Sequence, residues 1–95
     1  MALIGYARVS TKEQETDLQL DALRRAGVTE IYQEKASSVG TRLQLRRCLA
    51  ALRPGDVFVI YKLDRVARSL PDLLSILADI KVAGALVKSL TEPLD

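Results

Sequence analysis

A near-continuous apolar run over residues 57–62, Val-Phe-Val-Ile-Tyr-Lys, limits most strongly what this chain can fold into. Its residues are mainly β-branched or aromatic, and no polar residue alternates with them to face water. A strand of this kind is expected in the middle of a parallel sheet, where helices cover both faces. A turn sequence, Arg53-Pro54-Gly55-Asp56, comes directly before it. The run therefore predicts a central strand in a covered parallel sheet.

Segments of strand and helix character alternate along the whole chain, which indicates an α/β fold. Strands are predicted over residues 2–7, 30–33, 57–62 and 85–90, and helices over residues 15–26, 42–52 and 70–82. The first helix carries Leu18 and Leu23 on one face and stops before Gly27, a residue common just past a helix end. We expect a three-layer α/β/α domain whose four-stranded parallel sheet has the order 2-1-3-4.

The composition excludes several classes of protein. With 48% hydrophobic and 4% aromatic residues, the 95-residue chain is expected to form one domain with an aliphatic core. No apolar run approaches the roughly 20 residues that cross a bilayer, and no signal-peptide pattern is present. We therefore expect a cytoplasmic protein without membrane contact. A single cysteine, Cys48, and no histidine exclude an internal disulfide and a thiolate zinc site, so Cys48 is expected in the core.

Basic residues are concentrated in the first two thirds of the chain. The net charge of +2 is too small to indicate nucleic-acid binding by itself. Residues 1–68, however, hold twelve Lys or Arg against eight Asp or Glu, whereas residues 69–95 hold two against four. Any anion-binding site is therefore expected upstream of residue 69.

Charged and reactive residues follow three of the predicted strands. Ligand sites of open α/β sheets lie beyond the carboxyl ends of the strands. Residues at one such edge are Arg8 and Ser10 after the first strand, Glu34 after the second, and Asp64, Arg65 and Arg68 after the third. The sequence thus predicts a cluster of charged groups and one hydroxyl at a single edge of the sheet.

Two interpretations of Ser10 remain open at this point. Ser10-x-x-Glu13 and Thr11-x-x-Gln14 both match the capping-box pattern, which would make this segment the start of a helix. Alternatively, Ser10 belongs to a site with Arg8, since residues two apart in extended chain face the same side.

Arg65 and Arg68 favour the second interpretation. Residues three apart share one face if the segment is helical. Two cations near a helix start oppose the helix dipole, so an anionic ligand explains them better than a structural role does.

Three guanidinium groups beside a serine hydroxyl indicate chemistry on a phosphodiester. Guanidinium groups bind phosphate oxygens in pairs and would offset charge in the transition state. Ser10 would be the nucleophile, and because the chain has no histidine, Asp64 is the nearest candidate to accept its proton. Arginines held this close repel one another, and Glu34, Asp56 and Asp64 are the expected countercharges.

The chain resembles the resolvase/invertase family of serine recombinases in six ordered motifs between residue 4 and about residue 92. These are Ile4-Gly5-Tyr6-Ala7-Arg8-Val9-Ser10-Thr11, Gln14, Asp17-Leu18-Gln19, Glu34-Lys35, Gly55-Asp56, and Leu63-Asp64-Arg65 with Arg68. The resemblance implies that Ser10 forms a 5′-phosphoserine bond to DNA and that rejoining needs no metal or nucleotide. It also implies that Arg8, Arg65 and Arg68 bind the scissile phosphate. Supporting roles follow for Arg42, Gln19, Asp64, Tyr6, Gln14 and Glu34.

The same resemblance implies double-stranded DNA as partner and a dimer or tetramer on DNA for the full-length parent. The chain stops at Asp95, ahead of the family's dimerisation helix and helix-turn-helix domain. We therefore expect this fragment to be a monomer or weak dimer that does not carry out strand exchange alone. The family's usual glycine, serine–glycine pair and proline are replaced here by Ala67, by residues 37–40 and by Leu43.

Two other functions compete with recombination. A non-catalytic interaction module could keep the fold without the chemistry, but the chain retains Arg8, Ser10, Arg65 and Arg68. An enzyme acting on small phosphorylated substrates would be expected to carry a glycine-rich phosphate loop, and none is present.

Overall fold

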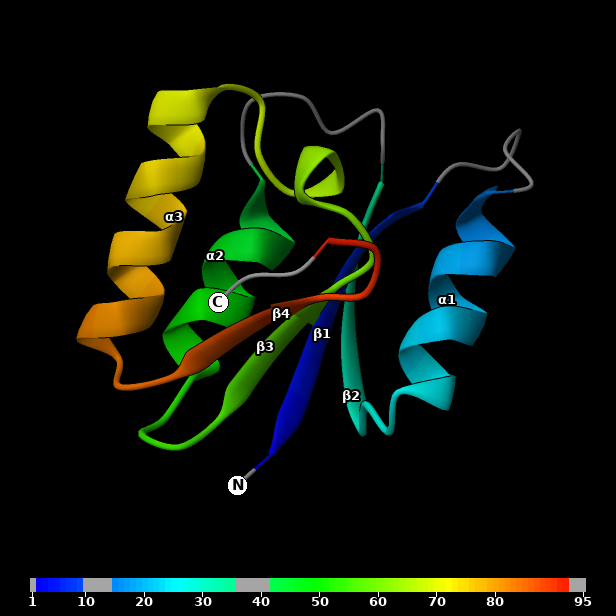
Figure 1. Cartoon of the computed structure of the whole chain (residues 1–95), viewed down its shortest axis with the longest axis horizontal. Coiled ribbons are helices and arrows are strands. Elements are labelled where there is room, and N and C mark those ends of the chain that lie inside the picture. Colours follow the sequence, from blue (N-terminus) through cyan, green and yellow to red (C-terminus); the bar gives the residue numbers. More distant parts are fainter. Residues whose placement is uncertain (1, 10–14, 36–41, 93–95) are drawn as a thin grey trace.

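The computed structural model describes residues 2–9, 15–35 and 42–92. Its centre is a four-stranded sheet of β1 (Leu3–Val9), β2 (Glu30–Lys35), β3 (Val57–Ile60) and β4 (Leu86–Ser89). All neighbouring strands are parallel, in the order β2-β1-β3-β4. The predicted fold class and strand order are therefore confirmed (Figure 1).

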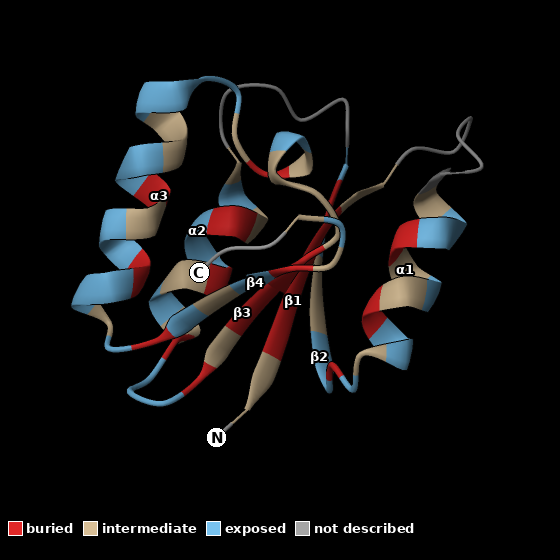
Figure 2. Cartoon of the chain, in the orientation of Figure 1, coloured by how far each residue is buried: buried red, intermediate tan, exposed pale blue. Residues whose placement is uncertain are grey.

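Three helices cover the two faces of this sheet. α1 (Glu15–Arg25) lies on one face, and α2 (Leu43–Ala51) and α3 (Leu70–Val82) lie on the other (Figure 1). The strands show why both faces need a cover: along β3, Phe58 and Ile60 pack with α2 and α3, whereas Val59 packs toward α1. Each of these three side chains is at most 1% exposed, so the central strand is buried on both faces as predicted (Figure 2).

The two faces have separate hydrophobic cores. The larger core contains Tyr6, Leu45, Cys48, Phe58 and Ile76, among others, which confirms Cys48 as a core residue. Burying one large apolar side chain contributes about 1.5–3 kcal/mol. The smaller core, under α1, is built from Ala7, Leu23, Val28 and Val59.

The inner face of α1 differs from the predicted one. Leu18 is 59% exposed, whereas Gln19 is only 1% exposed and lies one turn before the buried Leu23. The amide of Gln19 donates from Nε2 to the backbone oxygen of Arg8 at 3.1 Å. The polar side chain of Gln19 can be buried because it is hydrogen-bonded to the end of β1. The apolar pattern of α1 does not predict this bond.

The segment after β3 also differs from the expected helical run. A single 3-10 turn, η1 (Leu63–Arg65), is followed by an irregular stretch to Ser69, which caps α3. The Oγ of Ser69 accepts a hydrogen bond from the backbone N–H of Asp72 at 3.2 Å, and Pro71 occupies the first turn. Because the cap starts a new helix at residue 70, Arg65 and Arg68 are not successive residues on one helix face.

Within the described part of the chain, no helix is long and apolar enough to cross a membrane.

Candidate active site

The carboxyl ends of the strands bring several of the predicted site residues to one edge of the sheet. Arg8 lies near the end of β1, directly opposite Glu34 in β2. β3 lies on the other side of β1, and Asp64, Arg65 and Arg68 follow β3 in the chain. The segment that follows β3 lies at the top of Figure 1. Ser10, Gln14 and residues 37–40 lie outside the described residues.

A buried pair, Tyr6 and Glu34, forms the floor of this edge. The hydroxyl of Tyr6 donates to Oε1 of Glu34 at 3.3 Å, and both residues are at most 5% exposed. Burial and the neighbouring carboxylate raise the pKa of Tyr6 well above its ordinary value. Tyr6 is therefore a neutral hydrogen-bond donor to Glu34 at any physiological pH.

Glu34 also supplies the missing cap of α2. Its two oxygens accept the backbone N–H groups of Gln44 at 3.3 Å and Leu45 at 3.1 Å. The N-cap residue of α2, Arg42, makes no capping bond, and the first turn of the helix has no acidic residue. A carboxylate from β2 thus meets the positive end of the helix dipole, so the main partners of Glu34 are α2 and Tyr6.

Gln19 holds the end of β1 from the other face of the sheet. Its bond to the backbone oxygen of Arg8 fixes the chain two residues before Ser10. The other amide atom, Oε1, is buried and has no hydrogen-bond partner among the described residues. The predicted supporting role of Gln19 can therefore be stated as a contact: its amide holds the backbone of Arg8 in place.

Arg42 is held in a strained backbone conformation at the start of α2. Its φ of 43° and ψ of 45° place it in the left-handed region, where it is the one non-glycine residue with positive φ in the described ranges. That conformation costs on the order of 1–2 kcal/mol for a residue with a Cβ. Such strain persists where surrounding contacts enforce it.

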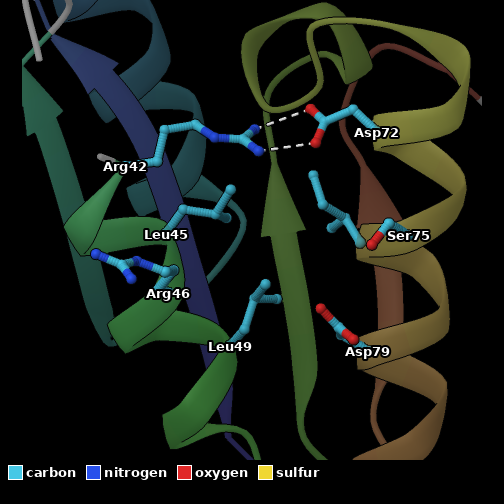
Figure 3. Close-up of a pocket in the computed structure, with 8 residues that line it drawn as sticks. Arg42, Leu45, Arg46, Leu49, Asp72, Ser75 and Asp79 are labelled. Atoms are coloured by element: carbon cyan, nitrogen blue, oxygen red, sulfur yellow. Dashed lines mark hydrogen bonds and ion pairs between the residues drawn. The ribbon is translucent and has the colours of Figure 1, made fainter. Parts of the chain in front are cut away.

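Those contacts come from α3 and from the stretch before it. The guanidinium of Arg42 donates to both carboxylate oxygens of Asp72, at 2.8 and 2.7 Å (Figure 3). It also donates to the backbone oxygen of Val66 at 3.3 Å. The side chains of the pair are 22% and 18% exposed. These hydrogen bonds raise the pKa of Arg42 and lower the pKa of Asp72.

Asp64 and Arg65 make a much looser pair. Their closest charged atoms are 4.0 Å apart, and the Asp64 side chain is 70% exposed. An exposed pair at this distance contributes little to stability. Asp64 is therefore open to solvent at the predicted edge, and its role as a proton acceptor stays a prediction.

The predicted countercharge role of Asp56 in this cluster is wrong. Asp56 precedes β3, so it lies at the amino ends of the strands, on the opposite edge of the sheet. Its oxygens accept the backbone N–H groups of Ala2 at 3.1 Å and Arg53 at 2.9 Å. Asp56 ties the turn before β3 to the chain leading into β1, which is a structural task.

Two further carboxylates, Asp72 and Glu92, were missed by the sequence reasoning. Asp72 accepts the backbone N–H of Arg68 at 2.9 Å. Glu92 accepts the backbone N–H of Leu63 at 3.0 Å and the hydroxyl of Ser89 at 2.6 Å, and these bonds lower its pKa. Together they hold both ends of residues 63–68, the segment with Arg65.

Only Asp72 had a signal in the sequence. Ser69 followed three residues later by an acid is a typical helix start, which is how α3 begins. Nothing local indicates that the same carboxylate would bind Arg42 or that Glu92 would bind Leu63, because both contacts join segments about 30 residues apart.

No group of three or more histidine, cysteine, aspartate or glutamate residues could hold a metal ion in the described ranges. Among the described residues, the chemistry available at this edge is that of arginine side chains and one exposed carboxylate. Such a set can bind a phosphate group and offset its negative charge.

Known proteins resemble this chain in sequence and in fold. It matches the family described as resolvase, N-terminal domain, over residues 3–95. Serine recombinase gin of Escherichia phage Mu is 45% identical over 94 residues, which are 98% of this chain and 49% of that protein. DNA-invertase hin of Salmonella typhimurium is 40% identical over an alignment of 96 positions, which covers 100% of this chain and 50% of that protein. The chain therefore spans about half the length of these relatives.

A solved structure shows the same fold at lower sequence similarity. A resolvase family site-specific recombinase from Streptococcus pneumoniae superposes with a TM-score of 0.80 at 21% identity. The superposition covers 100% of this chain and 75% of that one.

Proposed function

Because this chain belongs to the resolvase family, whose N-terminal domain it matches over nearly its whole length, we propose that it cleaves and rejoins DNA strands through Ser10. The observation that carries the proposal is the arrangement of the arginines. Arg8 is the second-last residue of β1, and Arg65 and Arg68 follow the neighbouring strand β3, so these three residues belong to one edge of the sheet. In the sequence, Ser10 comes two residues after Arg8.

In the proposed reaction, the Oγ of Ser10 attacks the phosphorus of a DNA phosphodiester. The bond from phosphorus to the 3′-oxygen breaks, which leaves a 5′-phosphoserine ester and a free 3′-hydroxyl. Arg8, Arg65 and Arg68 offset the charge that develops on the phosphate oxygens. The chain has no histidine, so Asp64 is proposed to take up the serine proton and Arg68 to protonate the leaving oxygen.

Rejoining reverses these steps. The 3′-hydroxyl of a partner strand attacks the phosphoserine, and Ser10 leaves with its proton restored. One phosphoester bond forms for each one that breaks, so the scheme consumes no nucleotide and assigns no step to a metal ion.

The proposed partner is double-stranded DNA, and the proposed working assembly is a tetramer in which each subunit supplies one Ser10 for one strand. We place this activity in the cytoplasm, where such DNA lies. The 95 residues alone are proposed to be monomeric or weakly associating and not competent for strand exchange.

The decisive experiment is to trap the covalent intermediate. The protein expressed from its complete reading frame is mixed with a nicked duplex carrying its recombination site, and the adduct is separated under denaturing conditions. We expect an adduct with the parent and none with Ser10→Ala. Ser75→Ala is the matched control, because Ser75 is an exposed serine on α3 and its loss should leave the adduct unchanged.

An adduct that persists in Ser10→Ala would assign the nucleophile to another residue. A parent protein that binds the site but forms no adduct would instead support a non-catalytic module.

A further inference from the structure

The strongest unassigned feature is the carboxylate of Asp72, which joins three parts of the molecule. One oxygen accepts from Nη1 of Arg42 at 2.8 Å and from the backbone N–H of Arg68 at 2.9 Å, and the other accepts from Nη2 of Arg42 at 2.7 Å. The start of α2, the start of α3 and the backbone of a proposed phosphate-binding arginine therefore meet at one side chain. Figure 3 shows the contact between Arg42 and Asp72.

Capping of α3 does not by itself explain these contacts. A side chain at the third position of a helix ordinarily reaches back to the backbone N–H of the cap residue. Asp72 instead reaches one residue further, to Arg68, while Ser69 satisfies the N–H of Asp72 at 3.2 Å. The cap would be complete without Arg42, so the bidentate pair serves another purpose.

Arg42 also reaches the segment between η1 and α3. Its Nη1 donates to the backbone oxygen of Val66 at 3.3 Å, and Val66 is buried, one residue after Arg65. The pair therefore fixes the backbone on both sides of residue 67, between the two arginines that follow β3. Arg42 adopts a strained left-handed conformation while making these contacts, and strain of this kind concentrates at functional sites.

We propose that Asp72 is a positioning residue for DNA cleavage, which acts by binding Arg42 and the backbone of Arg68 together. It touches neither the substrate nor the reacting atoms, and it sets where Arg65 and Arg68 present their guanidinium groups. This inference rests on the proposed function, since the position of these arginines matters only if they bind the scissile phosphate.

Asp72→Asn tests the proposal with a nearly identical shape. The amide keeps one acceptor oxygen but loses the charge and the bidentate contact with Arg42. Misplaced or unsupported active-site groups typically lower rates by about 10- to 100-fold, and we expect that loss in the single-turnover rate of Ser10–DNA adduct formation at saturating DNA. DNA affinity should stay equal or become tighter, because the variant removes a negative charge. General destabilisation of the protein would instead lower both the rate of adduct formation and the DNA affinity.

Two control variants separate positioning from other roles of the helix. Ser69→Ala removes the cap of α3 but leaves both charges of the pair. Asp79→Asn removes a second carboxylate that lines the same groove between α2 and α3 (Figure 3). Both should form the adduct within about 3-fold of the parent rate, since neither changes the partners of Arg42. An Asp72→Asn rate equal to that of the parent or of Ser69→Ala overturns the proposal.

Arg42→Lys breaks the bidentate contact from the other side and keeps the positive charge. The losses from Arg42→Lys and Asp72→Asn should not multiply in the double variant, because both remove one interaction. Multiplied losses would show that the two residues act independently. If Asp72→Asn does not fold, the test rests on Arg42→Lys alone. A rate of adduct formation equal to that of the parent in Arg42→Lys then refutes the role of the pair.

The parent and Ser10→Ala proteins are measured alongside. A parent that forms no Ser10-dependent adduct refutes the proposed function, and the role of Asp72 falls with it. A parent that forms the adduct while Asp72→Asn matches its rate refutes the role of Asp72 alone.

Discussion

Truncation of Glu34 to alanine should be among the most destabilising single changes in this domain. The carboxylate accepts the hydroxyl of Tyr6 and the backbone N–H groups of Gln44 and Leu45. Loss of the helix cap costs about 1 kcal/mol, and leaving a buried hydroxyl unpaired costs a further 1–3 kcal/mol. We expect a total loss of about 3 kcal/mol in the free energy of unfolding.

For a domain of this size, each 1 kcal/mol shifts the melting temperature by roughly 4–8 °C. Glu34→Ala should therefore melt roughly 12–24 °C below the parent, as followed by far-UV circular dichroism. Gln33→Ala is the matched control on the same strand, because the exposed Gln33 side chain should change stability by no more than about 0.5 kcal/mol.

Tyr6→Phe separates the two contributions. It removes one of the three bonds and leaves both helix N–H groups bound to Glu34, so we expect a loss of about 1 kcal/mol. A Glu34→Ala variant within about 1 kcal/mol of the parent would refute the reasoning that this carboxylate caps α2.

Three further predictions concern packing, pH and charge. Gly5→Ala should destabilise the domain by about 1–3 kcal/mol in urea unfolding, because a Cβ at residue 5 would lie 2.9 Å from Cγ1 of Val28; an unchanged midpoint would contradict this close packing. The lowered pKa of Asp72 implies stability that is present above its ordinary pKa of 3.8 and is lost as the pH falls through the folded value. The difference in melting temperature between the parent and Asp72→Asn should therefore be constant from about pH 7 to pH 5 and shrink below about pH 4; a constant difference down to pH 2 would argue against it. Replacing Arg65 or Arg68 by glutamine should weaken duplex binding and lower the slope of log affinity against log salt by about 1 for each residue, and unchanged slopes would place the DNA surface elsewhere.

The fold was predictable because a strand that is buried on both faces of a sheet has a continuous apolar sequence. The apolar run that includes Phe58 and Val59 is typical of a covered strand, and its alternation with helical segments indicated the parallel sheet that the structure has. The arginines were predictable for a similar reason, since a residue that follows a parallel strand must lie at the carboxyl edge. Asp56 was misassigned because it precedes its strand, which places it at the opposite edge.

The sequence by itself determined the α/β class and the edge of the sheet at which Arg8, Arg65 and Arg68 lie. Only the tertiary structure decided that Glu34 caps α2 and that Asp72 binds Arg42. The physical reason is the sequence separation between the residues that interact. Hydrophobic periodicity reports how each element meets the core next to it, whereas these carboxylates bind groups 11 and 30 residues away. Those partners are chosen by where separate helices begin and how they pack on the sheet, and no local pattern carries that information.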